Sequence, residues 1–264
     1  MSETSRGLFF QTTDIRPPWS SKGSAVLFHH GIGTNHAIWS EWVPIIAARY
    51  SVVQFDMRGF GNSVVPDKAH LWSLQEMVED VWNVVDAAGH RSVHLVGESF
   101  GATVVLAAAL ARPERVASLR MLNGAFKGQG LGELGNWEQQ FSEGSSKGWS
   151  ERMMTNRFYA DACSPEALAW FDREQSKTLP WVAIGLGRVL ANVNLTPQLQ
   201  NLNAVTHIVL PDASPFVSVD HGHEFVSHVK HAQLRVVAGA RHGLPFSHAK
   251  TEAQALLNTL DSLN

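Results

Sequence analysis

Short apolar runs rich in β-branched residues alternate along the chain with stretches of helical periodicity. Such runs predict strands buried on both faces, because a parallel sheet is covered by helices on either side. The six runs of this kind span residues 25–29, 52–55, 93–96, 119–122, 206–210 and 234–237. Residues 7–15 predict one or two further strands, antiparallel and at an edge. This alternation predicts an α/β fold with a mostly parallel sheet.

Helical patterns occupy the spaces between the predicted strands. Ser73 precedes one of them and Glu76 follows three residues later, which is typical of a capping box. Gly89 marks the end of that helix. The pattern over 100–111 is apolar nearly all round and predicts a buried helix. The predicted helices span residues 39–49, 73–88, 100–111 and 249–263.

Residues 126–200 interrupt the alternation. They contain no clear strand, begin with a Gly-rich segment and continue with helical patterns that carry four tryptophans. We expect a helical cap over 126–200, inserted into a core made of 1–125 and 201–264. An insertion at the C-terminal edge of a parallel sheet tends to cover the site formed there.

Composition narrows the classes of function. The 264 residues carry a net charge of −3, so the chain lacks the basic stripe that nucleic acid needs. Cys163 is the sole cysteine, which excludes an intramolecular disulfide and favours a cytoplasmic location. No run of about 18 apolar residues predicts a membrane span. We expect the binding partner to be a small-molecule substrate. A homodimer is also compatible with the sequence.

The pentapeptide Gly97-Glu98-Ser99-Phe100-Gly101 follows a predicted strand and opens a predicted helix. This strand–turn–helix context is what a nucleophile elbow requires, with small residues where strand and helix approach each other. The sharp turn exposes the serine hydroxyl at the N-terminus of the helix, which favours developing negative charge. The sequence therefore predicts Ser99 as a nucleophile.

A second Gly-rich loop, His30-Gly31-Ile32-Gly33, follows the first central strand. A loop of this kind can turn a backbone N–H toward the nucleophile. We expect an oxyanion hole formed by the amides of Ile32 and Phe100, the latter directly after the nucleophile.

His242 follows the last predicted strand, and a histidine that comes last in the chain order suits a triad with an earlier serine. The rival His248 lies at the start of the final helix, where it is expected as a surface or capping group. Four histidines at 221, 223, 228 and 231 have no trusted metal-ligand spacing and are interpreted as a helix surface. No metal site and no cofactor are predicted, since no phosphate loop or dinucleotide fingerprint is present.

Together these motifs resemble the α/β-hydrolase superfamily over nearly the whole chain. Trp39 and the stretch Asp56-Met57-Arg58-Gly59-Phe60-Gly61-Asn62-Ser63 add to the likeness. The resemblance implies the α/β-hydrolase fold. More narrowly, the layout is similar to the 3-oxoadipate enol-lactonase group. A weaker likeness to zearalenone-type lactonases rests on Ala213-Ser214-Pro215 and on residues 242–245.

The third member of the triad departs from the family pattern. Relatives tend to carry an aspartate before the proline that follows the strand at 206–210, and Ser214 stands there in this chain. Some relatives place the acid after the earlier strand, where this chain has Asn123. We expect Asn123 first, then Asp212 or Asp220. A triad without a carboxylate is expected to be slow, since an Asp-to-Asn change in a serine triad costs about 10⁴ in turnover.

These residues predict acyl transfer to water through a serine-bound intermediate, with a small to medium, largely apolar ester, lactone or amide as substrate. Two alternatives remain open. One is a C–C bond hydrolase or cofactor-free oxygenase on the same fold, and the other is a ligand-binding member with weak or no catalysis.

Overall fold

A single sheet dominates the computed structural model, which describes residues 2–20, 23–132, 137–143 and 145–263. Residues 1 and 264, the two ends of the predicted core, lie outside the described residues. The described strands follow one another across the sheet in the order β1-β2-β4-β3-β5-β6-β7-β8. Their bounds are β1 Ser2–Glu3, β2 Phe9–Thr13, β3 Ala25–His29, β4 Val52–Phe55, β5 Val93–Glu98, β6 Val116–Leu122, β7 Val205–Pro211 and β8 Ala232–Val237.

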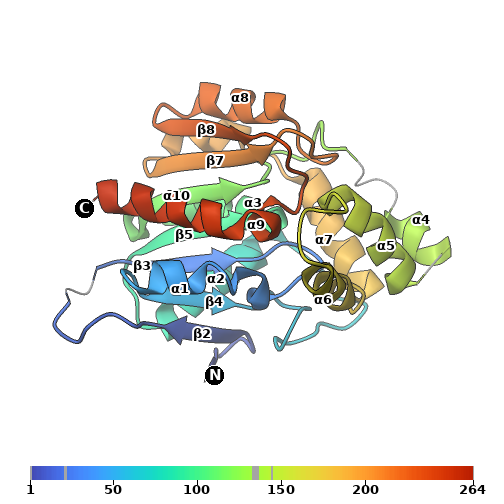
Figure 1. Cartoon of the computed structure of the whole chain (residues 1–264), viewed down its shortest axis with the longest axis horizontal. Coiled ribbons are helices and arrows are strands. Elements are labelled where there is room, and N and C mark those ends of the chain that lie inside the picture. Colours follow the sequence, from blue (N-terminus) through green and yellow to red (C-terminus); the bar gives the residue numbers. More distant parts are fainter. Residues whose placement is uncertain (1, 21–22, 133–136, 144, 264) are drawn as a thin grey trace.

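The six predicted strands are confirmed as β3 to β8, which pair in parallel, but the prediction that all are buried is wrong for β8, an edge strand that is partly exposed. The predicted antiparallel edge is also confirmed, because β2 pairs antiparallel with β4 and β1 with β2. Parallel pairing brings the C-terminal ends of β3, β5, β6, β7 and β8 to one edge (Figure 1). The loops that leave this edge carry the chemistry predicted from the sequence.

Helices cover both faces of the sheet. Alternate side chains of β3 enter different cores: Ala25 and Leu27 pack with α2 and α3, whereas Val26 and Phe28 pack with α1 and α10. This alternation is the period of two that a strand imposes. The helices of the core are α1 Val43–Ala47, α2 Leu74–Ala87, α3 Phe100–Ala111, α8 Val219–His228, α9 Leu244–Ser247 and α10 Ala249–Ser262.

The helix predicted over 39–49 is wrong in its extent. The structure has a 3-10 turn at His36–Trp39 and a separate short helix, α1, from Val43. Pro44 lies in the first turn of α1. Its ring removes a backbone donor and clashes with the preceding turn, so a continuous helix cannot pass through it.

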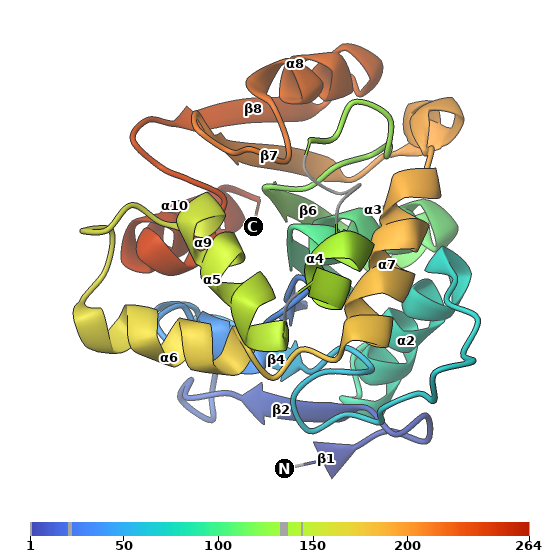
Figure 2. The same cartoon turned by 90° about the vertical axis from the view of Figure 1, so that its right-hand side faces the viewer.

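Among the described residues, four α-helices lie between β6 and β7, and we call them the cap helices. They lie beyond the C-terminal edge of the sheet, above the ends of the central strands (Figure 2). Among the described residues, no helix has the length and apolar character needed to cross a membrane. The cap helices are α4 Trp137–Glu143, α5 Ser146–Arg157, α6 Pro165–Gln175 and α7 Pro180–Asn192.

The histidines of α8 are not all surface groups, and the interpretation of this cluster was wrong for His221. His221 is buried, and its Nε2 accepts a hydrogen bond of 3.2 Å from the Phe126 amide. Burial lowers the pKa of His221 to about 4. Within the described ranges, no three His, Cys, Asp or Glu side chains form a group that could hold a metal ion.

Buried neutral histidines make the fold sensitive to acid. Burial lowers the pKa of His29 to about 3 and of His30 and His94 to about 4, as it does for His221. In the unfolded chain these groups take up protons near pH 6.5, so the unfolded state binds more protons as the pH falls. The free energy of unfolding should therefore fall between about pH 6.5 and about pH 4, by about 1.4 kcal/mol per pH unit for each histidine.

Urea unfolding of His221→Gln from about pH 7 to about pH 5 checks this expectation. A glutamine can still accept a hydrogen bond from the Phe126 amide. The free energy of unfolding should then fall less steeply as the pH is lowered, by the contribution of one histidine. His223→Gln, at an exposed position of the same helix, is the matched control and should keep the original slope. Equal slopes in the two variants would contradict this assignment.

Candidate active site

Ser99 lies at the sharp turn between β5 and α3. Its backbone is in the left-handed region, with φ 55° and ψ −121°, which is strained for a residue with a side chain. A Cβ at Gly97 would lie 2.5 Å from the Gly101 carbonyl oxygen, and one at Gly101 would lie 2.4 Å from the His30 carbonyl oxygen. Only glycine therefore lets strand, turn and helix approach this closely.

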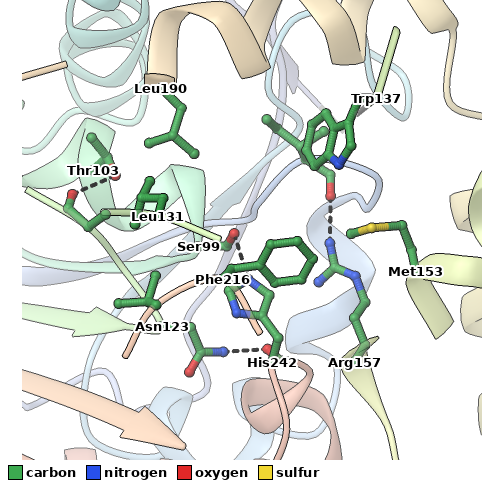
Figure 3. Close-up of a pocket in the computed structure, with 13 residues that line it drawn as sticks. Ser99, Thr103, Asn123, Leu131, Trp137, Met153, Arg157, Leu190, Phe216 and His242 are labelled. Carbon is green, nitrogen blue, oxygen red and sulfur yellow. Dashed lines mark hydrogen bonds between the residues drawn. The ribbon is translucent and has the colours of Figure 1, made fainter. Parts of the chain in front are cut away.

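His242 reaches Ser99 from the loop after β8. Its Nε2 lies 2.9 Å from Ser99 Oγ (Figure 3). The ring is buried against Phe216, with centroids 4.7 Å apart. Burial, together with the positive charge of Arg157, holds the pKa of His242 well below its usual value of 6.5. The imidazole is therefore neutral over the physiological range of pH.

The other ring nitrogen of His242 faces a serine. Ser214 Oγ lies 3.0 Å from His242 Nδ1, and it also accepts hydrogen bonds of 3.2 Å from the amides of Phe216 and Val217. A hydroxyl has two acceptor sites and one proton to donate. Because both acceptor sites are used by the amides, the proton is what remains for Nδ1. We therefore infer that His242 Nδ1 accepts this proton and that the ring proton is on Nε2, on the side of Ser99 Oγ.

Asn123, expected first as the third triad member, does not reach His242 Nδ1. Its backbone is left-handed at φ 57°, and its amide donates to the Val209 carbonyl oxygen. In this conformation the side-chain Nδ2 donates instead to the backbone carbonyl oxygen of His242, at 2.5 Å. Figure 3 shows the carboxamide below the ring, directed at the main chain of the histidine loop.

The two aspartates kept as alternatives also lie elsewhere. The Asp212 carboxylate accepts from the amides of Gly239 and Ala240, and so braces the turn after β8. Asp220 is exposed in the first turn of α8. No aspartate or glutamate among the described residues forms a hydrogen bond with the His242 ring.

The loop after β3 lies beside Ser99, as its sequence predicts. The Gly31 carbonyl oxygen accepts from His30 Nδ1 at 2.8 Å and from the Thr34 hydroxyl at 3.2 Å. This fixes the plane of the Gly31–Ile32 peptide and directs the Ile32 N–H to the opposite side. In the described part of the chain, the amides of Ile32 and Phe100 make no hydrogen bond within the protein.

The cavity beside Ser99 and His242 is narrow and mostly apolar. It holds about 20 Å³, room for one or two water molecules. Among the described residues that line it, Arg157 on cap helix α5 is the one with a permanently charged side chain. The apolar lining consists of Ile32, Ala125, Leu131, Trp137, Met153, Leu190, Phe216 and Val217.

Sequence reasoning missed Arg157 and its partner Glu98, which lie 3.2 Å apart in the interior. A signal was available at Glu98, because a carboxylate at the end of a buried strand needs a cationic partner. Nothing in the helical pattern of residues 146–157 marks Arg157, since its role depends on how the cap helices dock.

Comparison with known proteins decides the family. Residues 24–249 match the family model described as alpha/beta hydrolase fold. The chain belongs to this family.

Relatives of this α/β hydrolase include a 3-oxoadipate enol-lactonase from Acinetobacter baylyi, 25% identical over 86% of this chain and 85% of that protein. A pimeloyl-[acyl-carrier protein] methyl ester esterase from Methylococcus capsulatus is 39% identical over 45% of this chain and 41% of its own. The crystal structure of the enol-lactonase from Burkholderia xenovorans LB400 superposes with a TM-score of 0.87 at 15% identity, covering 96% of each chain.

These relatives confirm the α/β-hydrolase fold and the resemblance to the enol-lactonase group, and they identify this α/β hydrolase as an enzyme. The weaker likeness to zearalenone-type lactonases stays a prediction.

The proton positions at His242 can be checked without any substrate. ¹⁵N NMR of the imidazole at neutral pH should give an unprotonated shift for Nδ1 and a protonated shift for Nε2. In Ser214→Asp the two assignments should exchange, because a carboxylate only accepts hydrogen bonds. A protonated Nδ1 in the wild-type protein would contradict the geometry argument.

Proposed function

We propose that this α/β hydrolase is a serine hydrolase that cleaves a small to medium, largely apolar ester or lactone through an acyl-enzyme. Ser99 is the nucleophile, His242 the general base, and the amides of Ile32 and Phe100 form the oxyanion hole. The observation that carries the proposal is the 2.9 Å contact between His242 Nε2 and a strained, elbow-borne Ser99 Oγ. Such a pair is the signature of an activated nucleophile.

The chemistry balances as two acyl transfers. Ser99 Oγ adds to the carbonyl carbon while its proton passes to His242 Nε2, and the two amides hold the negative oxygen that forms. His242 returns the proton to the departing alkoxide, which leaves an acyl ester on Ser99. A water then attacks that ester with His242 as base, releasing the acid and restoring both residues.

The serine behind His242 makes this a slow version of the reaction. Before His242 can accept from Ser99, the ring proton has to move from Nε2 to Nδ1 and the Ser214 hydroxyl has to turn away. Losing one neutral hydrogen bond costs about 1 kcal/mol, which corresponds to about a fivefold lower rate. The imidazolium that forms next has no carboxylate beside it, and Arg157 opposes its charge. Both effects point to low turnover rather than none.

The lining of the cavity supports an uncharged reacting group. The described part of its walls is apolar apart from Ser99, His242, Thr103, Asn123 and Arg157. The Thr103 hydroxyl donates its proton to the Ala125 carbonyl oxygen, and Asn123 Nδ2 uses one of its two N–H groups for the His242 carbonyl oxygen. Because the cavity holds about 20 Å³, entry of any ester requires movement of the cap helices.

A second candidate, a ligand-binding member with weak or no catalysis, is favoured by the inverted tautomer at His242. In that reading the Nε2–H donates to a bound ligand and Ser99 is never acylated. A fluorophosphonate probe separates the two candidates, since it modifies only an activated serine.

Replacing Ser99 with alanine should abolish both fluorophosphonate labelling and hydrolysis of p-nitrophenyl acetate, because the acyl acceptor is lost. Ser40→Ala, at an exposed position after the 3-10 turn, is the control and should react as wild type does. Activity that survives in Ser99→Ala would refute the serine mechanism.

Replacing Ser214 with aspartate should raise kcat at least tenfold, since a carboxylate accepts from His242 Nδ1 and stabilises the imidazolium. The amides of Phe216 and Val217 are already placed to hold that carboxylate. Ser218→Asp, at the N-cap of α8, adds the same charge and should leave kcat unchanged. An equal kcat in wild type and Ser214→Asp would mean that His242 does not limit the reaction.

The same variant should shift the pH profile. Protonation of His242 removes the base, so kcat/KM falls as the pH drops through the pKa of the free enzyme. That pKa is held below 6.5 in the wild type, so its activity should persist into mild acid. Aspartate at 214 favours the imidazolium, raises the pKa, and should move the loss of activity to higher pH.

A further inference from the structure

Glu98 and Arg157 form an ion pair that joins the elbow to the cap helices. The side chains are 3% and 2% exposed, and Arg157 Nη1 lies 3.2 Å from Glu98 Oε1. Burial raises the pKa of Glu98, whereas Arg157 and the Gly31 amide favour its ionised form. Glu98 directly precedes the nucleophile, so any cap residue bound to it lies beside the reacting centre.

Arg157 contacts both loops that carry the other site residues. Its Nη2 donates to the Ile32 carbonyl oxygen at 2.8 Å, and Figure 3 shows the guanidinium directed at that oxygen. Its own backbone carbonyl oxygen accepts from the Gly243 amide at 2.8 Å, next to His242. The guanidinium also lies 5.4 Å from the centroid of the Phe171 ring on α6.

These contacts fix the peptides on both sides of Ile32. The preceding peptide is held through the Gly31 carbonyl oxygen by His30 and Thr34. The following peptide is held through the Ile32 carbonyl oxygen by Arg157. A Cβ at Gly31 would lie 2.0 Å from Glu98 Oε2, so the Glu98 carboxylate also packs directly against the backbone of this loop. With both peptides fixed, the direction of the Ile32 N–H is fixed as well.

We propose that Arg157, held in place by Glu98, is a positioning residue that aligns the Ile32 amide in the oxyanion hole, so that the hole is completed only when cap helix α5 is docked. This inference rests on the proposed serine mechanism. It also links substrate entry to catalysis. Movement of α5 away from the core opens the narrow cavity and releases the Ile32 peptide. When α5 docks again, the cavity closes and the Ile32 amide is realigned.

The geometry favours positioning over a purely stabilising role. Well-packed apolar residues often replace a buried ion pair at no loss of stability, so folding alone does not explain this one. An arginine presents several donors in a rigid planar fork, which lets one side chain bind Glu98 and the Ile32 carbonyl oxygen together. A lysine, with a single ammonium on a flexible stem, lacks that fork.

The test is the double variant Glu98→Gln with Arg157→Met, which removes both charges and leaves none unpaired. We expect kcat for p-nitrophenyl acetate to fall at least tenfold with KM within about twofold, since one misaligned oxyanion donor acts on the transition state. Arg152→Met, an exposed arginine on the same helix, is the matched control and should keep wild-type kcat. Arg157→Lys should retain the ion pair with Glu98, but its kcat should stay below the wild-type value.

Hydrogen exchange provides a readout that does not depend on turnover. In the double variant, and in Arg157→Lys if the double variant does not fold, amides of residues 31–35 should exchange faster while exchange in the β5 and β6 strands is unchanged. Wild-type kcat would overturn the proposal. So would reduced kcat with unchanged exchange at 31–35, because Arg157 would then act on the substrate directly.

The two proposals fail in different ways. If wild-type protein neither hydrolyses p-nitrophenyl acetate nor reacts with a fluorophosphonate, the serine mechanism fails. Faster exchange at 31–35 in the variants would still establish that Arg157 holds the loop. If the wild type is active and the variants keep both its kcat and its exchange, only the positioning role of Arg157 fails.

Discussion

The turn at Ser99 is the constraint on which the rest of the site depends. A serine with φ 55° persists only because the packing around it leaves no alternative, and two glycines make that packing possible. The strain points Oγ away from the sheet and toward His242. It also puts Glu98 in the interior, where a carboxylate requires a cation. One local conformation thus determines where the Ser99 hydroxyl points, how far it lies from His242, and why Glu98 needs Arg157 as its partner.

Electrostatically, the site is the reverse of an ordinary triad. The positive charge of Arg157 acts on His242 and lowers its pKa, whereas the group at Nδ1 is a neutral hydroxyl. Both favour a neutral imidazole with its proton on Nε2. The same arginine supports the proposed oxyanion hole, because it stabilises the loop that carries the Ile32 amide. The structure therefore combines a firmly held Ile32 loop with a histidine whose Nδ1 faces a neutral hydroxyl.

The candidate site residues that could be proposed from the sequence are those that lie in local motifs or follow from chain order. Ser99, Ile32 and Phe100 lie in glycine-rich turns whose backbone geometry is nearly dictated by their residues, and His242 follows from chain order. Asn123 was weighted too strongly, because the direction of its side chain depends on a left-handed backbone held by Val209 of a neighbouring strand. Arg157 was missed because cap helices dock through tertiary contacts that leave no periodic pattern. Of the fold, the strands were predictable from apolar runs, and the helix interrupted by Pro44 was not predicted correctly.

The central claim is that Ser99 becomes acylated despite the hydroxyl at His242 Nδ1. Mass spectrometry of the protein mixed with p-nitrophenyl acetate and quenched in acid tests it directly. The account predicts one acetyl group per chain, found on the peptide that contains Ser99 and formed more slowly than in Ser214→Asp. An unmodified Ser99 peptide in both proteins, or an acetyl group confined to other residues, would contradict it.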